Sequence, residues 1–201
     1  QIQISRSMEP KFFGRHYPRG WEWYANQFEA DPRRPLRGEA STMYTSSYGS
    51  YARTPELIHH HLGTIPLIYL VRHPLRRIES HWRHWRGRIK DCPSFDQLLR
   101  SPRLRQRVVE ASLYHQQWQR YRRWFPQQSM LGVTTEELSA HPQTSLRRIL
   151  SFIGATPDCS RLLEEGEMPR MNLAGSKGRQ EVSAPTWSEG LKQEAIDIIR
   201  P

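Results

Sequence analysis

Arginine and serine side chains follow a short apolar run at a fixed spacing, in the pattern Arg72-x-Pro74-x-x-Arg77-x-x-Ser80. Pro74 suits the first turn of a helix, where a backbone N–H is not needed, so Ser80 would stand about two turns into that helix. An Arg fork, the free amides of a helix start and a hydroxyl can together bind phosphate or sulfate. The spacing therefore indicates an anion site, although an ordinary strand-helix junction with a solvated basic face gives the same pattern.

A carboxylate near the start of the chain could perform proton transfer. Glu9 follows the alternating residues 1–5, QIQIS, which predict a half-buried strand, and Pro10 should end that strand. Glu9 could take a proton from a hydroxyl or an amine, although a solvated strand end is the simpler alternative. Its ordinary pKa of about 4.3 makes it a weak base at neutral pH, so proximity and partial desolvation would have to supply the rest.

A glycine-containing basic loop lies near the end of the chain, in residues 172–180, NLAGSKGRQ. Gly178 permits a close backbone approach to a ligand, while Lys177 and Arg179 supply positive charge around a loop that can fold over an anion. Such loops are common, so this one alone is a weak indication of an anion site.

The elements that must position these groups are predicted from periodicity. Residues 67–71, LIYLV, are typical of a parallel strand covered on both faces, which places Arg72 at its carboxyl end, where open α/β sheets bind ligands. Further strands are expected at residues 36–41 and 129–133. Helices are expected after Thr54 as a cap, over 111–126, from 134 onward and over 146–154, and Trp21, Tyr24 and Phe28 are expected to pack in the core. The alternation predicts an α/β fold, a three-layer sandwich with a central, mainly parallel sheet that is related to the phosphate-loop nucleotide-binding folds.

Length and composition limit the possible partners. The 201 residues predict a single domain over 1–201, and the formal net charge of +10 favours an anionic partner: a nucleotide, a polyanionic acceptor or nucleic acid. The two cysteines show no CxxC or Cys/His ligand spacing, which argues against a structural zinc site and favours a reducing, cytoplasmic location. No stretch approaches the length of a membrane span.

Four ordered segments resemble the sulfotransferases that use 3′-phosphoadenosine-5′-phosphosulfate (PAPS). Residues 72–80 resemble the family's 3′-phosphate-binding segment, and residues 8–28 resemble the Glu-x-x-Phe-Phe stretch of the heparan-type enzymes. Residues 38–44, GEASTMY, and residues 176–179, SKGR, match two further family segments. The resemblance implies that Glu9 is the general base and that no metal is used. It implies that Arg72 and Ser80 hold the 3′-phosphate while Lys177, Gly178 and Arg179 close over it.

The chain departs from the family pattern in two ways. Met8 and Ala40 stand where many heparan-type members carry lysine, which weakens the inference that the acceptor is a sulfated sugar chain. Nothing in residues 1–8 resembles the family's Lys-x-Gly-Thr-Thr-like loop, which binds the 5′-phosphosulfate. Because the chain opens on Gln1, we expect that an N-terminal portion with this loop is missing rather than degenerate.

The sequence therefore predicts transfer of a sulfuryl group from PAPS to a hydroxyl or an amine, with saccharides among the candidate acceptors. The alternative is a non-enzymatic basic module that binds nucleic acid or another polyanion through Arg83, Arg86, Arg88 and the residues 100–107. A kinase-like enzyme is disfavoured, because no Mg²⁺-binding Asp pattern accompanies the loops.

Overall fold

The structure is a computed structural model that describes residues 2–29, 31–159, 162–163 and 182–200. Its strands are β1 (Ile2–Ile4), β2 (Leu36–Gly38), β3 (Leu67–Val71) and β4 (Met130–Thr134). Its α-helices are α1 (Gly20–Ala25), α2 (Thr54–Leu62), α3 (Pro74–Arg86), α4 (Phe95–Arg100), α5 (Pro102–Val109), α6 (Tyr114–Arg122), α7 (Thr135–Ala140), α8 (Pro142–Phe152) and α9 (Glu189–Ile199). Short 3-10 helices are η1 (Tyr17–Arg19), η2 (Thr42–Thr45), η3 (Gly49–Tyr51), η4 (Glu110–Ser112) and η5 (Gln127–Ser129).

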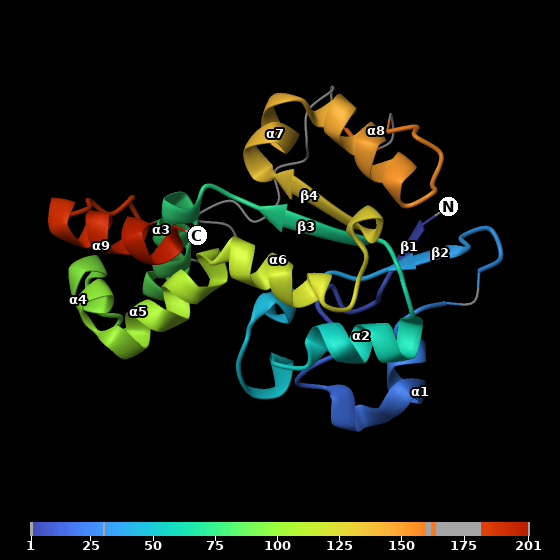
Figure 1. Cartoon of the computed structure of the whole chain (residues 1–201), viewed down its shortest axis with the longest axis horizontal. Coiled ribbons are helices and arrows are strands. Elements are labelled where there is room, and N and C mark those ends of the chain that lie inside the picture. The colour runs from blue at the N-terminus through green and yellow to red at the C-terminus, as the bar shows by residue number, and fades with distance from the viewer. Residues whose placement is uncertain (1, 30, 160–161, 164–181, 201) are drawn as a thin grey trace.

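The strands pair in parallel, as the sequence predicts. β1 pairs with β2, with Ile2 opposite Leu36, and β3 pairs with β4, with Leu67 opposite Met130. Within the described ranges, the strands form these two pairs and no ladder joins one pair to the other. Figure 1 shows the strand arrows pointing toward the same side of the molecule, so the carboxyl ends of both pairs share one edge.

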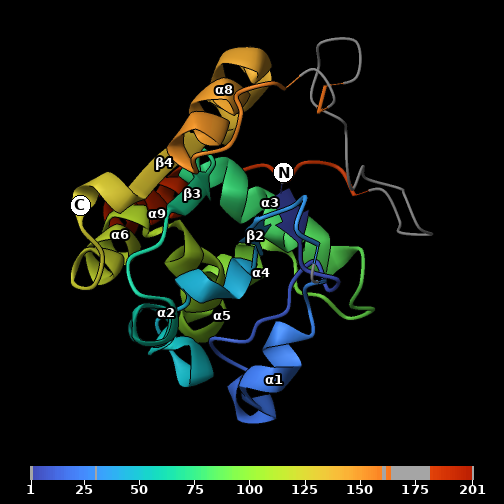
Figure 2. The same ribbon diagram turned by 90° about the vertical axis from the view of Figure 1, so that its right-hand side faces the viewer.

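Helices lie on both sides of the strands. Figures 1 and 2 show α7 and α8 on one side and α1 and α2 on the other. Helix α6 packs on β3 through Trp118, whose ring stacks on Tyr69 with the centroids 6.3 Å apart. A separate helical group, α3, α4, α5 and α9, lies beyond the carboxyl end of β3 (Figure 1). The arrangement agrees with the predicted layering of helices, strands and helices.

One face of β3 is open to solvent. Its side chains alternate between partly buried and exposed, and Ile68 and Leu70 are 43% and 52% exposed. The prediction of a strand covered on both faces is therefore wrong for the part of the chain that the structure describes. An unbroken apolar run does not say how many faces are covered. Tyr69, between Ile68 and Leu70, instead packs on Tyr114 and Trp118 of α6.

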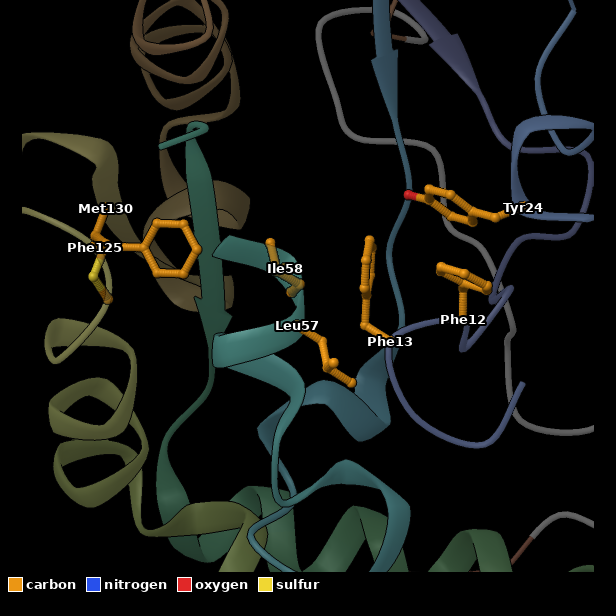
Figure 3. Packing of buried hydrophobic residues seen from close by; sticks show 7 residues of the cluster. All are labelled: Phe12, Phe13, Tyr24, Leu57, Ile58, Phe125 and Met130. Carbon is orange, nitrogen blue, oxygen red and sulfur yellow. The ribbon is translucent and has the colours of Figure 1, made fainter. Parts of the chain in front are cut away.

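The main hydrophobic core joins the strands to the N-terminal aromatic segment. Phe12 and Phe13 are each 1% exposed, and Phe12 stacks on Tyr24 with the ring centroids 4.5 Å apart. Trp21 differs from the expected packing, because it lies at the edge of this cluster with 45% of its surface exposed and stacks on His61. The buried members of the cluster are Phe12, Phe13, Tyr24, Leu57, Ile58, Phe125 and Met130 (Figure 3).

Two smaller cores stabilise the remaining helices. Ile78 of α3 is 0% exposed and packs with residues of α4, α5 and α9, including Leu98 and Leu191. Leu146 and Leu150 of α8 pack toward the β1–β2 pair. These clusters fix α3, which carries part of the candidate anion site, and the first strand pair, which leads to Glu9.

Thr54 ties helix α2 to the segment that follows Glu9. The sequence predicts Thr54 as a helix cap, but α2 begins at Thr54 itself, and Arg53 occupies the cap position. The Thr54 side chain is fully buried, and its hydroxyl donates a hydrogen bond of 2.6 Å to the backbone carbonyl of Phe13. The Thr54 hydroxyl therefore bonds this distant, buried carbonyl, and α2 has no side-chain cap.

Replacing Thr54 with Val should destabilise the protein. The change keeps the side-chain shape and leaves the buried Phe13 carbonyl without its donor, which costs about 1–3 kcal/mol in the free energy of unfolding. Urea denaturation would measure the loss. Thr45→Val is the matched control, since the Thr45 hydroxyl bonds an exposed carbonyl within its own turn. Equal stabilities for wild type and Thr54→Val would show that this hydrogen bond contributes nothing.

Candidate active site

Glu9 stands beyond the carboxyl end of β1 with its side chain 36% exposed. The ammonium Nζ of Lys11 lies 3.0 Å from its Oε2 atom, and the Thr42 hydroxyl donates a hydrogen bond of 3.0 Å to its Oε1 atom. Both carboxylate oxygens are therefore oriented by defined partners, and part of the carboxylate remains open to solvent. A small molecule could reach this group from outside.

The pKa of Glu9 lies below its ordinary value. Burial acts to raise it, but the hydrogen bonds from Lys11 and Thr42 and the positive charge of Lys11 together outweigh burial. Desolvation thus acts in the direction that a stronger base needs, but in the free protein the neighbouring cation and hydroxyl stabilise the charged form and the pKa falls. Glu9 is consequently a carboxylate at neutral pH, the form that can accept a proton.

Lys11 is a site residue that the sequence reasoning missed. Its backbone φ of +51° lies in the left-handed region, which side chains other than glycine rarely adopt. This conformation lets a lysine two positions after Glu9 reach back to it. Thr42 is also absent from the predicted site residues, although it lies in the segment 38–44 that resembles the family. The signal for Lys11 was its closeness in sequence to Glu9, and the signal for Thr42 was its place in that segment.

The Arg72 segment has the predicted local structure. Arg72 directly follows β3, Pro74 occupies the first turn of α3, and both Arg72 and Ser80 are exposed. The amides at the helix start are not all free, however, because the His73 N–H donates to a carboxylate oxygen of Glu136 at 3.1 Å. In the described part of the chain, no hydrogen bond or ion pair joins Arg72 to Ser80 or to Glu9. Glu9 and Arg72 follow strands that point to the same side of the molecule (Figure 1), while Ser80 lies within α3.

Arg77 differs from Arg72 in pointing inward. Its guanidinium donates a hydrogen bond of 2.6 Å to the Val108 carbonyl, and burial lowers its pKa. Arg77 therefore links α3 to the end of α5. This contact helps to fix the helix that begins immediately after Arg72.

An aromatic hollow lies beside the carboxyl end of β3. Its volume is about 250 Å³, and its walls are suited to a flat ring. Tyr114, which forms part of the wall, has its pKa raised by burial. The lining residues are Tyr69, Val71, Tyr114, His115, Trp118 and Gly132.

Three predicted site residues, Lys177, Gly178 and Arg179, lie outside the described residues. Among the residues that are described, no cluster of three or more His, Cys, Asp or Glu could hold a metal ion. In the same ranges, no helix is long and apolar enough to span a membrane. Cys92 and Cys159 are buried, free thiols, and the cytoplasmic location stays a prediction.

Several of the arginines that the basic-module alternative would use to bind a polyanion make contacts within the protein instead. Arg83 donates to the Val182 carbonyl and Arg86 to the Cys92 carbonyl, each at 2.7 Å. Arg105 pairs with Glu194 at 2.8 Å. Guanidinium groups that are engaged in this way are less available to phosphates, which counts against the basic-module alternative.

Parallel strands, helices on both sides, and a carboxylate and an arginine beyond the strand ends define an α/β domain of the class that binds ligands at the carboxyl edge of its sheet. The chain belongs to the sulfotransferase domain family, whose family model matches residues 5–171. The fold also resembles the crystal structure of a sulfotransferase from Alicyclobacillus acidocaldarius, with a TM-score of 0.74 and 18% identity over 100% of this chain and 81% of that one. This likeness confirms the predicted α/β fold.

The chain is also similar to curated eukaryotic proteins. It is 30% identical to mouse heparan sulfate glucosamine 3-O-sulfotransferase 3B1, across 96% of this chain and 53% of that protein. It is 29% identical to human heparan sulfate glucosamine 3-O-sulfotransferase 6, across 96% of this chain and 60% of that protein. The chain thus spans between half and two thirds of the length of these relatives.

Proposed function

We propose that this chain carries the acceptor side and the 3′-phosphate side of a PAPS-dependent sulfotransferase. The observation that carries the proposal is the Glu9 carboxylate, held by Lys11 and Thr42 beyond β1, on the side of the molecule to which β3 also points and where Arg72 follows it (Figure 1). Membership of the sulfotransferase domain family supports it. The heparan sulfate 3-O-sulfotransferase relatives support a saccharide hydroxyl as the acceptor, with an amine as the alternative.

Glu9 is proposed to take the proton of the acceptor O–H as the acceptor oxygen attacks the sulfur of PAPS. The new S–O bond forms while the bond between sulfur and the phosphate oxygen breaks, and 3′,5′-adenosine diphosphate leaves. Alignment of acceptor and donor, together with cationic groups around the transferred charge, lowers the barrier of such a displacement. The ammonium of Lys11, next to Glu9, is placed to contribute to this cationic environment.

The nucleotide is proposed to bind where α3 begins. Arg72 and Ser80 would hold the 3′-phosphate, and Lys177, Gly178 and Arg179 would close over it. The aromatic hollow beside Val71 would offer its rings to the base. A 5′-phosphosulfate loop has no counterpart in residues 1–8.

Calorimetric titration with 3′,5′-adenosine diphosphate tests this binding mode. We expect binding in the micromolar range, and a loss of about 10-fold or more in Arg72→Ala, because a guanidinium-phosphate pair is a strong charge-assisted contact. Adenosine 5′-monophosphate, which lacks the 3′-phosphate, should bind weakly to both proteins. Arg76→Ala is the matched control, since Arg76 is an exposed arginine of α3, four residues after Arg72. Binding of single-stranded DNA alone, with a steep salt dependence, would replace the proposal with the polyanion-binding module.

A further inference from the structure

A second carboxylate, Glu39, lies partly buried just after β2 and accepts hydrogen bonds from three hydroxyls. Tyr44 donates to it at 2.7 Å, Ser41 at 2.8 Å and Tyr24 at 3.4 Å. We propose that Glu39 is a positioning residue for Glu9, acting through the hydroxyls of Ser41 and Tyr44 on the backbone of residues 11–13. The inference rests on the proposed function in one respect, the role of Glu9 as the base.

Each of two hydroxyls joins Glu39 to a backbone amide near Glu9. The Ser41 oxygen accepts the Lys11 N–H at 3.0 Å, and the Tyr44 oxygen accepts the Phe13 N–H at 3.1 Å. A hydroxyl has a single proton, and here that proton points to Glu39, which leaves the oxygen lone pairs for the two amides. An ionised carboxylate can only accept, so it fixes the direction of both chains of hydrogen bonds.

The first of these chains holds Lys11 in its unfavourable conformation. A left-handed backbone costs a lysine about 1–2 kcal/mol, so Lys11 needs a partner that keeps it there. The hydrogen bond to Ser41 supplies that partner, and the resulting conformation places the Lys11 ammonium on Glu9. Thr42, the residue after Ser41, bonds the other oxygen of Glu9. The segment after Glu39 therefore positions Glu9 from both sides.

The ionisation of Glu39 does not stabilise the fold. Burial raises the pKa of Glu39, and the hydrogen bonds from Tyr44, Ser41 and Tyr24 offset burial only in part. Because the folded-state pKa lies above the unfolded value, stability from this group is present below the unfolded pKa and is lost as pH rises through the folded pKa. A carboxylate kept despite this cost is consistent with a role in the site rather than in stability.

Two variants break the hydrogen-bond chain at different points. Glu39→Gln puts an amide N–H against a hydroxyl that already receives a backbone N–H, and Ser41→Ala removes the hydroxyl. In the whole enzyme, each should lower kcat on the order of 10-fold with the KM for PAPS unchanged, because small misplacements of a reacting group are costly. The double variant should lose little more than Glu39→Gln alone, since both changes interrupt the chain that runs from Glu39 through Ser41 to Lys11.

A second experiment does not depend on activity: carbon NMR during a pH titration measures the pKa of the Glu9 carboxyl. In wild type its pKa should lie below about 4.3, and in Glu39→Gln and Ser41→Ala it should rise toward that value as Lys11 moves away. Ser41→Thr, which keeps the hydroxyl, should behave as wild type. Ser129→Ala is the control, since the Ser129 hydroxyl bonds only a local carbonyl.

An unchanged Glu9 titration in both Glu39→Gln and Ser41→Ala would overturn the positioning role. Failure of the wild-type protein to transfer a sulfuryl group would instead overturn the proposed function. In that case the NMR titration alone still decides whether Glu39 positions Glu9, so the two failures are distinguishable.

Discussion

Replacing Glu9 with Gln should lower kcat by about 10²–10⁴-fold, the usual contribution of a positioned general base. Gln keeps the size of the side chain and an oxygen for Thr42, but it cannot accept the acceptor's proton. The Kd for 3′,5′-adenosine diphosphate should stay within about twofold of wild type, because the interaction lost is made in the transition state only. Initial-rate kinetics on the whole protein and calorimetry on the same preparation would measure the two quantities.

Glu22→Gln is the matched control for this experiment. Glu22 is an exposed carboxylate on α1, and its replacement should change neither kcat nor nucleotide binding. A Glu9→Gln enzyme with turnover near that of wild type would exclude Glu9 as the base. A protein that loses nucleotide binding together with turnover would point to a folding defect, which circular dichroism would reveal.

Local features of the fold could be predicted because neighbouring residues determine them. Pro74 begins α3 as expected, since its fixed φ and missing N–H suit a first helical turn. Thr134 caps α7 by accepting the Glu137 N–H, and the parallel strands β3 and β4 lie within about one residue of their predicted ranges. Each of these depends on a few consecutive residues, so the sequence alone carries the necessary information.

The site depends instead on contacts between distant segments. Lys11 meets Ser41 across thirty positions, and its left-handed backbone follows from that contact rather than from any local propensity of lysine. Arg83 reaches a carbonyl 99 residues away, which no charge pattern could indicate. Glu39 belonged to a recognised segment, but its link to the residues after Glu9 passes through Ser41 and Tyr44, which receive the N–H groups of Lys11 and Phe13 some thirty positions away.

The resemblance in sequence and the structure contribute different parts of the proposal. The resemblance named Glu9, Arg72 and Ser80 but gave no relation between them. The structure places Glu9 and Arg72 beyond the carboxyl ends of strands that point the same way (Figure 1). It also adds Lys11 and Thr42 as direct partners of Glu9.

Replacing Phe13 with Ala should cost about 3–5 kcal/mol in the free energy of unfolding, the range for removing a buried aromatic side chain. Phe13 is 1% exposed and packs edge-on against Tyr24, with the ring centroids 5.2 Å apart (Figure 3). The surrounding backbone is held by Thr54 and Tyr44, so it cannot easily collapse into the space that the ring leaves. Urea denaturation monitored by tryptophan fluorescence would measure the change.

Trp21→Ala provides the comparison, because this substitution removes a larger ring from the exposed edge of the same cluster. Its loss should cost only about 1 kcal/mol, since its surface is already 45% in water. If the two substitutions cost the same, the cluster would not be packed around Phe13 as described. A larger loss for Phe13→Ala would show that the buried ring contributes more to stability than the exposed one. The segment that follows Glu9 is then anchored by a hydrophobic cluster as well as by the hydrogen bonds to Phe13.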